Sequence, residues 1–171
     1  MTRIKSKGRL RYRRRRTGET DYRRRLKLLK SGQHRAVVRV SNTQVTCQLV
    51  KYDVDGDKVL VSCSGKSISA LGWPETASNK SIPASYVIGY LMGSKAAKLG
   101  CNDAVLDIGL SAASSGSRNF AALKGMVDAG LNIPHDESVL PSEERINGEH
   151  INKSIAKSVE KIIKKIGGSK K

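Results

Sequence analysis

AVVRVSNTQVTCQLVKYDVDGDKVLVSCS, residues 36–64, is the stretch that decides the fold of this chain. It contains three runs rich in Val, Thr and Leu, a composition typical of β-strands. Turn-favouring residues separate the runs, Ser-Asn after the first and Asp-Gly after the second. The stretch therefore predicts an antiparallel three-stranded meander. The predicted strands are residues 36–40, 43–52 and 58–64.

Beyond the meander, the chain alternates predicted helices with short predicted strands. A proline leads into the first helix, and a glycine follows each helix where it is expected to stop. The order β-β-β-α-β-α, with a further short strand, indicates an α/β fold. Its mixed sheet consists of an antiparallel meander followed by βαβ-type units. The predicted elements are a helix at 84–99, a strand at 104–108, a helix at 118–129 and a strand at 131–133.

The first of these helices contains Gly89 and Gly93, which would let a second backbone approach closely. The segments on either side of the helical region are expected to be irregular. Residues 65–83 are rich in Gly, Ser and Pro and predict a loop, and residues 136–150 predict a surface excursion.

Charge is segregated along the chain, whose net charge is +17. Residues 1–35 hold fifteen Lys and Arg against two acidic residues, whereas residues 36–150 hold ten against twelve. The tail, 151–171, holds seven lysines and one glutamate. A nearly neutral body thus carries a strongly basic arm and a smaller basic tail, a distribution that favours binding to a polyanion.

The basic arm has two parts. Residues 1–19 have no apolar periodicity, so we expect them to be extended when alone. Residues 20–29 predict a short helix capped by Thr20. Tyr22, Leu26 and Leu29 share one face, and we expect this apolar stripe to hold the helix on the body while its arginines face outward.

The tail predicts a basic amphipathic helix, in which isoleucines and a valine alternate with lysines at helical spacing. The sequence therefore suggests three regions. They are a basic arm with its short helix at 1–34, an α/β domain at 35–150 and a C-terminal helix at 151–171.

Cysteine and histidine usage argues against disulfides, metals and cofactors. The three cysteines form no C-x-x-C pair, and their odd count speaks against a disulfide framework. The three histidines are scattered. The first ten residues lack the apolar core of a signal peptide, and no apolar run is long enough to span a membrane. We expect a cytoplasmic protein that holds no metal or cofactor.

Motifs for catalysis or ion binding fail on inspection. Gly65-Lys66-Ser67 would need a glycine at position 60 to complete a P-loop, and that residue is Leu60. Asp53, Asp55 and Asp57 match the first ligand positions of an EF-hand calcium loop. The loop also requires a glycine at its sixth position and a glutamate at its twelfth, and these positions hold Lys58 and Ser64. No nucleophile elbow surrounds any serine, and the carboxylates near strand ends are too few to assign metal ligands. The chain is not expected to be an enzyme.

Residues 114–118 offer a second anion-binding candidate. A loop of small residues leads into a predicted helix whose free N–H groups and positive dipole end would attract a phosphate beside Arg118. An ordinary strand-to-helix loop explains the same pattern equally well. The basic arm favours the anion-binding interpretation, because a second phosphate contact would fit a large RNA surface.

Five blocks of the sequence, in order, resemble the 5S-rRNA-binding protein family of the large ribosomal subunit in its archaeal form. The resemblance implies an architecture similar to ribonuclease H without its active site. It also implies that the chain docks 5S rRNA on large-subunit rRNA in the central protuberance, beside neighbouring large-subunit ribosomal proteins. The blocks are RRRRTGETDYRRRLKLLKSG (13–32), RAVVRVSN (35–42), AVLDIGL (104–110), GSRNFAALKGMVDAGLNIPH (116–135) and LPSEERINGEHI (140–151).

The RNA contacts that the resemblance and the charge pattern assign lie in the arm, after the first strand and at the start of the second long helix. The residues are Arg9, Arg11, Tyr12, Arg13, Arg14, Arg15, Arg16, Thr17, Tyr22, Arg23, Arg24, Arg25, Lys27, Lys30, Arg35, Ser41, Asn42, Gly116, Ser117 and Arg118.

Two other function classes stay open at this point. A ribonuclease-H-like nuclease would need a tight carboxylate cluster. A protein that binds anionic membranes would use the basic C-terminal helix, with its apolar stripe facing the lipid.

Overall fold

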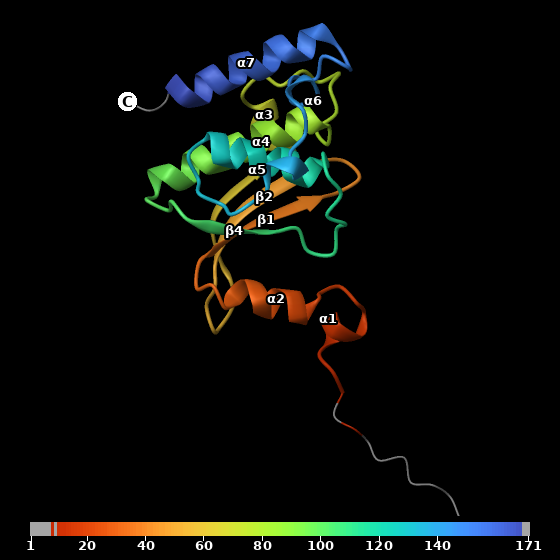
Figure 1. The fold of residues 1–171 in the computed structure, drawn as a ribbon, viewed down its shortest axis with the longest axis vertical. Helices are drawn as coiled ribbons and strands as arrows, with labels where there is room; N and C mark the ends of the chain where they lie inside the picture. The colour runs from red at the N-terminus through yellow and green to blue at the C-terminus, as the bar shows by residue number, and fades with distance from the viewer. Residues whose placement is uncertain (1–7, 9, 169–171) are drawn as a thin grey trace, which may run out of the picture.

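A computed structural model describes residue 8 and residues 10–168 (Figure 1). Their helices and strands follow the predicted order. They are α1 (Arg13–Arg16), α2 (Tyr22–Leu29), β1 (His34–Val40), β2 (Val45–Lys51), β3 (Lys58–Ser64), α3 (Gly65–Ser69), α4 (Ile82–Lys98), β4 (Ala104–Asp107), α5 (Arg118–Asp128), the 3-10 helix Glu137–Val139, α6 (Glu143–Asn147) and α7 (Lys153–Gly168).

The sheet confirms the predicted fold class. Its four strands lie in the order β3-β2-β1-β4. The pairs β1–β2 and β2–β3 are antiparallel, which is the meander, and β4 pairs with β1 in parallel after the chain has passed through α4. The result is a mixed α/β fold. Because β1 and β4 are parallel, the segments that follow them emerge at the same end of the sheet.

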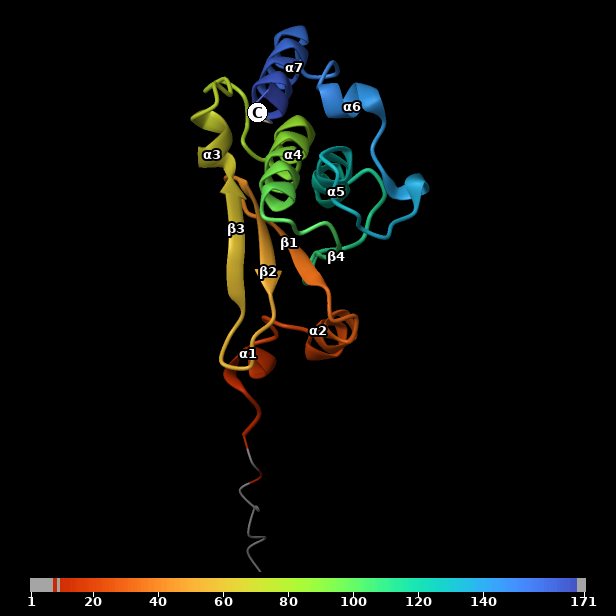
Figure 2. The same ribbon diagram turned by 90° about the vertical axis from the view of Figure 1, so that its left-hand side faces the viewer.

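Helices cover one face of the sheet in two layers (Figure 2). α4 and α5 pack side by side on the strands, and α7 lies across the outer side of α4. Strand residues that face these helices are fully buried, among them Val38, Cys47 and Leu49. A core formed from side chains of all these elements holds the body together, since each buried aliphatic side chain contributes roughly 1.5–3 kcal/mol.

The contact between α4 and α5 confirms the role expected of Gly89 and Gly93. A Cβ built on Gly89 would lie 2.1 Å from the carbonyl oxygen of Ala122, and one on Gly93 would lie 2.8 Å from the Cβ of Ala129. Gly125 of α5 fits against α4 in the same way, 2.1 Å from the carbonyl oxygen of Tyr86. The two backbones are thus closer than any side chain at these positions would allow.

α7 is amphipathic, as the sequence predicts, and its apolar stripe is used inside the molecule. Ile155, Val159, Ile162 and Ile166 are buried in the main core, and α7 packs on α4. Lys165 ties the end of the helix to the body through a hydrogen bond to the carbonyl oxygen of Leu71, 3.0 Å away.

Three segments are more regular than predicted. Residues 13–16, which belong to the part of the arm expected to be extended, form the single helical turn α1. The expected loop 65–83 begins with α3, where Ser64 and Ser67 form a capping box and Ile68 is fully buried. Residues 136–150 contain a 3-10 turn and α6, which buries Ile146. Short helices of this length have little periodicity, so their hydrophobic anchors are visible only in the tertiary structure.

The predicted strand at 131–133 was wrong as a strand. The segment pairs with the sheet through one isolated parallel bridge, Asp103 to Asn132. Its two apolar residues, Leu131 and Ile133, are nevertheless buried in the core. The apolar pattern of this segment therefore predicted its burial correctly, but its backbone pairs with the sheet over too short a length to form a fifth strand.

Candidate nucleic-acid interface

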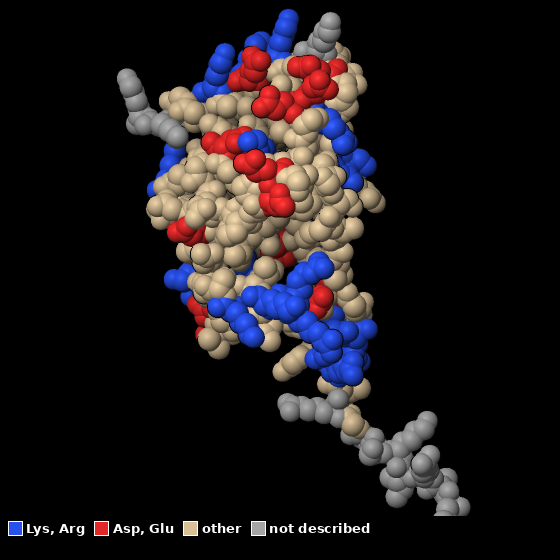
Figure 3. Space-filling model, viewed as in Figure 1, with Lys and Arg blue, Asp and Glu red and all other residues tan. Residues whose placement is uncertain are grey.

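Basic side chains gather at the end of the molecule that carries α1 and α2, as Figure 3 shows. The four arginines of α1 are all exposed, and so are Arg23, Lys27 and Lys30 of the α2 region. Around them, Thr17 donates a hydrogen bond to Glu19, and Arg14 lies 3.7 Å from the same carboxylate. This surface, α1 together with the outer side of α2, is called the basic end below.

The N-terminus of α2 is capped by Asp21, one residue later than the predicted Thr20. Its carboxylate accepts hydrogen bonds from the backbone N–H groups of Arg23 and Arg24, at 2.9 and 3.1 Å. These bonds hold the pKa of Asp21 below its ordinary value, because they stabilise the charged form. An aspartate at this position satisfies two free N–H groups of the first turn.

The expected apolar attachment of α2 was wrong. Leu26, the centre of the predicted stripe, is 57% exposed, and no residue of α2 is buried. Two arginines attach the helix instead. Arg24 donates a 2.6 Å hydrogen bond to the carbonyl oxygen of Gly109, and Arg25 donates to both carboxylate oxygens of Asp57, at 2.9 and 2.8 Å.

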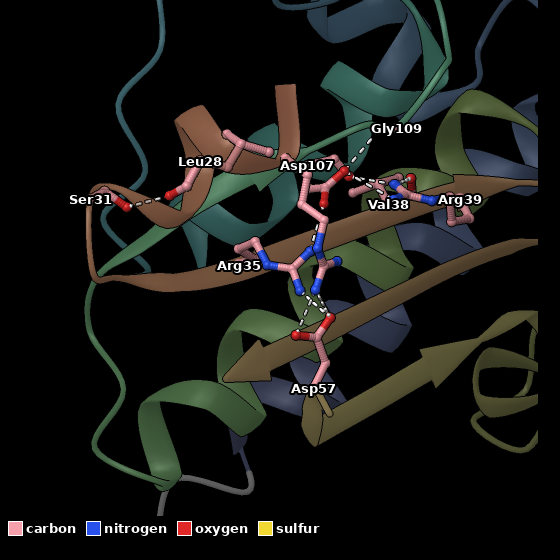
Figure 4. Close-up of polar contacts among 9 residues, drawn as sticks. Leu28, Ser31, Arg35, Val38, Arg39, Asp57, Asp107 and Gly109 are labelled. Carbon is pink, nitrogen blue, oxygen red and sulfur yellow. Dashed lines mark hydrogen bonds and ion pairs between the residues drawn. The ribbon is translucent and has the colours of Figure 1, made fainter. Parts of the chain in front are cut away.

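Arg35, expected in the interface, is placed inside the molecule (Figure 4). Its side chain is only 3% exposed and pairs with Asp107, 2.9 Å away, and with Asp57. Asp57 therefore joins Arg25 of α2 to Arg35 of β1. Arg35 is a structural link between the arm and the sheet, and its guanidinium is not available to a ligand in this structure.

Arg39 is the residue that the sequence analysis missed. It donates hydrogen bonds to the backbone carbonyls of Val38 and Asp107, at 2.8 and 2.7 Å, and to the Asp107 carboxylate at 2.9 Å. Despite these three bonds, its side chain is 49% exposed. Strand alternation places Arg35 and Arg39 on the same face of β1, and that pattern was visible in the sequence.

The two carboxylates of this network are held in the charged form. Burial raises the pKa of Asp57, but hydrogen bonds from Arg25 and Arg35 outweigh it and hold the pKa below the ordinary value. Burial likewise raises the pKa of Asp107, but the charge and hydrogen bonds of Arg39 outweigh it. Together with the Gly109 N–H and Arg35, they hold the pKa below the ordinary value. Both aspartates are therefore ionised at neutral pH.

Acid should loosen this end of the molecule. Because both pKa values are lowered in the folded state, the stabilisation they bring is present above the unfolded pKa of about 4 and is lost as pH falls through the folded pKa. We expect the Tm to change little from about pH 7 to 5 and to fall below about pH 4. Circular dichroism melts at each pH measure this, and Asp107→Asn should show a smaller drop. An equal drop in both proteins would contradict the prediction.

The remaining predicted contacts lie at one end of the sheet. Ser41 and Asn42 are exposed in the link that follows β1, and Gly116 to Arg118 end the loop that follows β4. The parallel pairing of β1 and β4 brings these links to the same end. Arg118 is exposed, whereas the hydroxyl of Ser117 is buried. Arg9 lies outside the described residues.

The comparisons with known proteins point to the ribosome. Residues 6–103 and 97–136 match the family described as ribosomal large subunit proteins 60S L5, and 50S L18. The chain is 52% identical to the large ribosomal subunit protein uL18 of Methanothermobacter thermautotrophicus over 142 residues, 83% of this chain and 73% of that protein. It is 46% identical to the uL18 of Methanococcus maripaludis over 91% of this chain and 79% of the relative.

The chain belongs to this ribosomal protein family. The resemblance seen in the sequence is thereby confirmed, and the chain is a structural constituent of the large ribosomal subunit and not an enzyme. In this L5/L18 family member, no described helix is long and apolar enough to cross a membrane.

Proposed function

We propose that this ribosomal protein binds 5S rRNA through its basic end and helps attach it to large-subunit rRNA in the central protuberance of the cytoplasmic ribosome. Family membership supports a place in the large subunit, and the distribution of charge supports the choice of surface. A run of exposed arginines on α1 and α2 suits phosphate contacts, since each guanidinium presents a planar fork of donors.

The observation that carries the proposal is that some basic residues of α2 bind the body of the protein while others stay exposed. Arg24 and Arg25 point to the body and fix the helix on Gly109 and Asp57. Arg23 and Lys27, one turn apart, are exposed and have no ion pair with a described residue. The basic end is thus held in a set orientation while retaining free cations, which is what recognition of a shaped RNA requires.

The open alternative of membrane binding is not favoured. An interfacial helix places its apolar face in the lipid. In α7 that face is occupied, because its aliphatic residues are packed in the core against α4. The lysines on the exposed side of α7 suit contact with a polyanion. We expect neighbouring rRNA or ribosomal proteins as the partners of this side.

A charge-reversal experiment tests the basic end. Arg23→Glu combined with Lys27→Glu should weaken binding to 5S rRNA by about 100-fold at moderate salt and reduce the salt slope of log K by about 2, because two phosphate contacts are lost. The matched control is Lys157→Glu with Lys161→Glu, which reverses two charges at the same spacing on α7. Filter binding across a salt titration gives both quantities. Equal losses in the two double variants would contradict the proposed surface.

Selectivity is tested in the same titration by competition. Charge alone attracts any RNA, whereas contacts placed by the folded body depend on RNA shape. The full chain should therefore keep its preference for 5S rRNA over unrelated RNA as salt rises. Equal competition by unrelated RNA at every salt concentration would show that 5S rRNA is not the specific ligand.

A further inference from the structure

A cleft of about 470 Å³ lies between α2 and the segment that leaves β4. Its lining includes Arg14 and Tyr22 from the arm, Arg39 from β1, and Ile108 and Leu110 after β4. This region is called the α2 cleft below. Its volume is within the range of small-ligand sites, and its lining includes Arg14, one of the exposed cations of the basic end.

The floor of the α2 cleft is a guanidinium held in one orientation. Three hydrogen bonds fix Arg39 to β1 and β4. A Cβ built on Gly109 would lie 2.9 Å from Cζ of Arg39 and 3.1 Å from both Nε and Nη2, so Gly109 packs over one flat face of the group. The side chain is half exposed and lines the cleft, so part of its surface is open to a ligand there.

The walls of the α2 cleft combine an aromatic ring, aliphatic side chains, further cations and the carboxylates of Glu19 and Asp21. Tyr22 is partly buried on the α2 side, whereas Leu110 is 61% exposed on the other. Arg14 and Arg24 bring positive charge to the same space. A bare phosphate would use only the cations. A planar base with its phosphate would also use the guanidinium face and the apolar walls.

We propose that the α2 cleft receives one unpaired nucleotide of the bound RNA, with its base stacked on Arg39 and its phosphate near Arg14. The inference rests on the proposed RNA binding and adds a selectivity element to it. Unstacked bases in RNA loops are commonly read by stacking on aromatic rings and arginine planes. Gly109 is a positioning residue, because any side chain there would displace the guanidinium.

The first test locates the nucleotide. The full chain bound to a 5S rRNA transcript is cross-linked with ultraviolet light, and the linked peptides and nucleotides are identified by mass spectrometry. We expect a cross-link between Tyr22 or the segment 108–111 and a nucleotide that is unpaired in the free RNA. Cross-links confined to α1 and the outer side of α2 would overturn the proposal.

The second test separates stacking from charge. Arg39→Lys keeps the positive charge but loses the planar group, so we expect about a 10-fold weaker binding with an unchanged salt slope. Arg145→Lys, at an exposed position of α6 outside the cleft and outside the basic end, should change binding less than about twofold. Circular dichroism melts verify that both variants fold. Should Arg39→Lys alter stability, Leu110→Glu, with Leu99→Glu as a similarly exposed control, tests the cleft without touching the ion network.

A double-mutant cycle completes the experiment. Removing the base of the cross-linked nucleotide should weaken binding of the wild-type chain about as much as Arg39→Lys does, and the two losses should not add. Additive losses would overturn the cleft assignment while leaving 5S rRNA binding intact. Loss of 5S preference in the wild-type chain would instead count against the proposed function itself, so the two failures are distinguishable.

Discussion

Asp107→Ala should lower the free energy of unfolding by about 3 kcal/mol, because it removes the more buried of the two carboxylate partners of a buried arginine. Arg35 is 3% exposed and would keep only Asp57, which itself is shared with Arg25. The same substitution releases Arg39, whose bond to the Asp107 carboxylate helps to orient it. Urea titration of the wild-type and variant chains measures the loss.

The matched control for this prediction is Asp53→Ala. Asp53 also pairs with a basic residue, Lys58, at 2.5 Å, but the lysine side chain is 70% exposed. Water solvates the exposed lysine once the carboxylate is removed, so the stability of the control should be close to that of the wild type. Equal losses for Asp107→Ala and Asp53→Ala would refute the structural role assigned to the buried network.

Gly125→Ala should be similarly damaging, with a net loss of about 3 kcal/mol, although alanine is the better helix former by about 1 kcal/mol. The added methyl group would meet the backbone of α4, 2.1 Å from the carbonyl oxygen of Tyr86 and 2.8 Å from the amide nitrogen of Tyr90. Backbone atoms within a helix cannot turn aside as a flexible side chain does. The two helices must therefore separate, and the packing around Met126 and Leu123 is lost with them.

Gly168→Ala is the control for the helix contact. Gly168 ends α7, and nothing lies within 4 Å of a Cβ built there. The substitution should leave the Tm unchanged or raise it slightly, because only the propensity gain remains. Thermal unfolding of both variants decides the matter: if Gly125→Ala is as stable as Gly168→Ala, the close approach of α4 and α5 is not what positions these helices.

The sequence alone determined the elements and the distribution of charge. Strand and helix patterns are local, because they depend on the alternation of apolar side chains over a few residues. The meander, α4, α5 and the start of α7 were therefore predicted to within two residues, and the predicted end of the last helix lies outside the described residues. The sequence also predicted the glycines that allow α4 and α5 to approach closely. It predicted the basic arm as well, in a chain that belongs to a family of large-subunit ribosomal proteins.

Only the tertiary structure decided which arginines bind the protein itself and which remain free for RNA. Arg24 and Arg25 find their partners 85 and 32 residues away, at Gly109 and Asp57, and Leu26 is turned outward as a result. Arg35 and Arg39 occupy equivalent places on β1, yet one is buried and the other forms the floor of a cleft. The local sequence treats these arginines alike. Their roles differ because a charge is buried only where a distant carboxylate or carbonyl compensates it, and the register of the sheet places those groups.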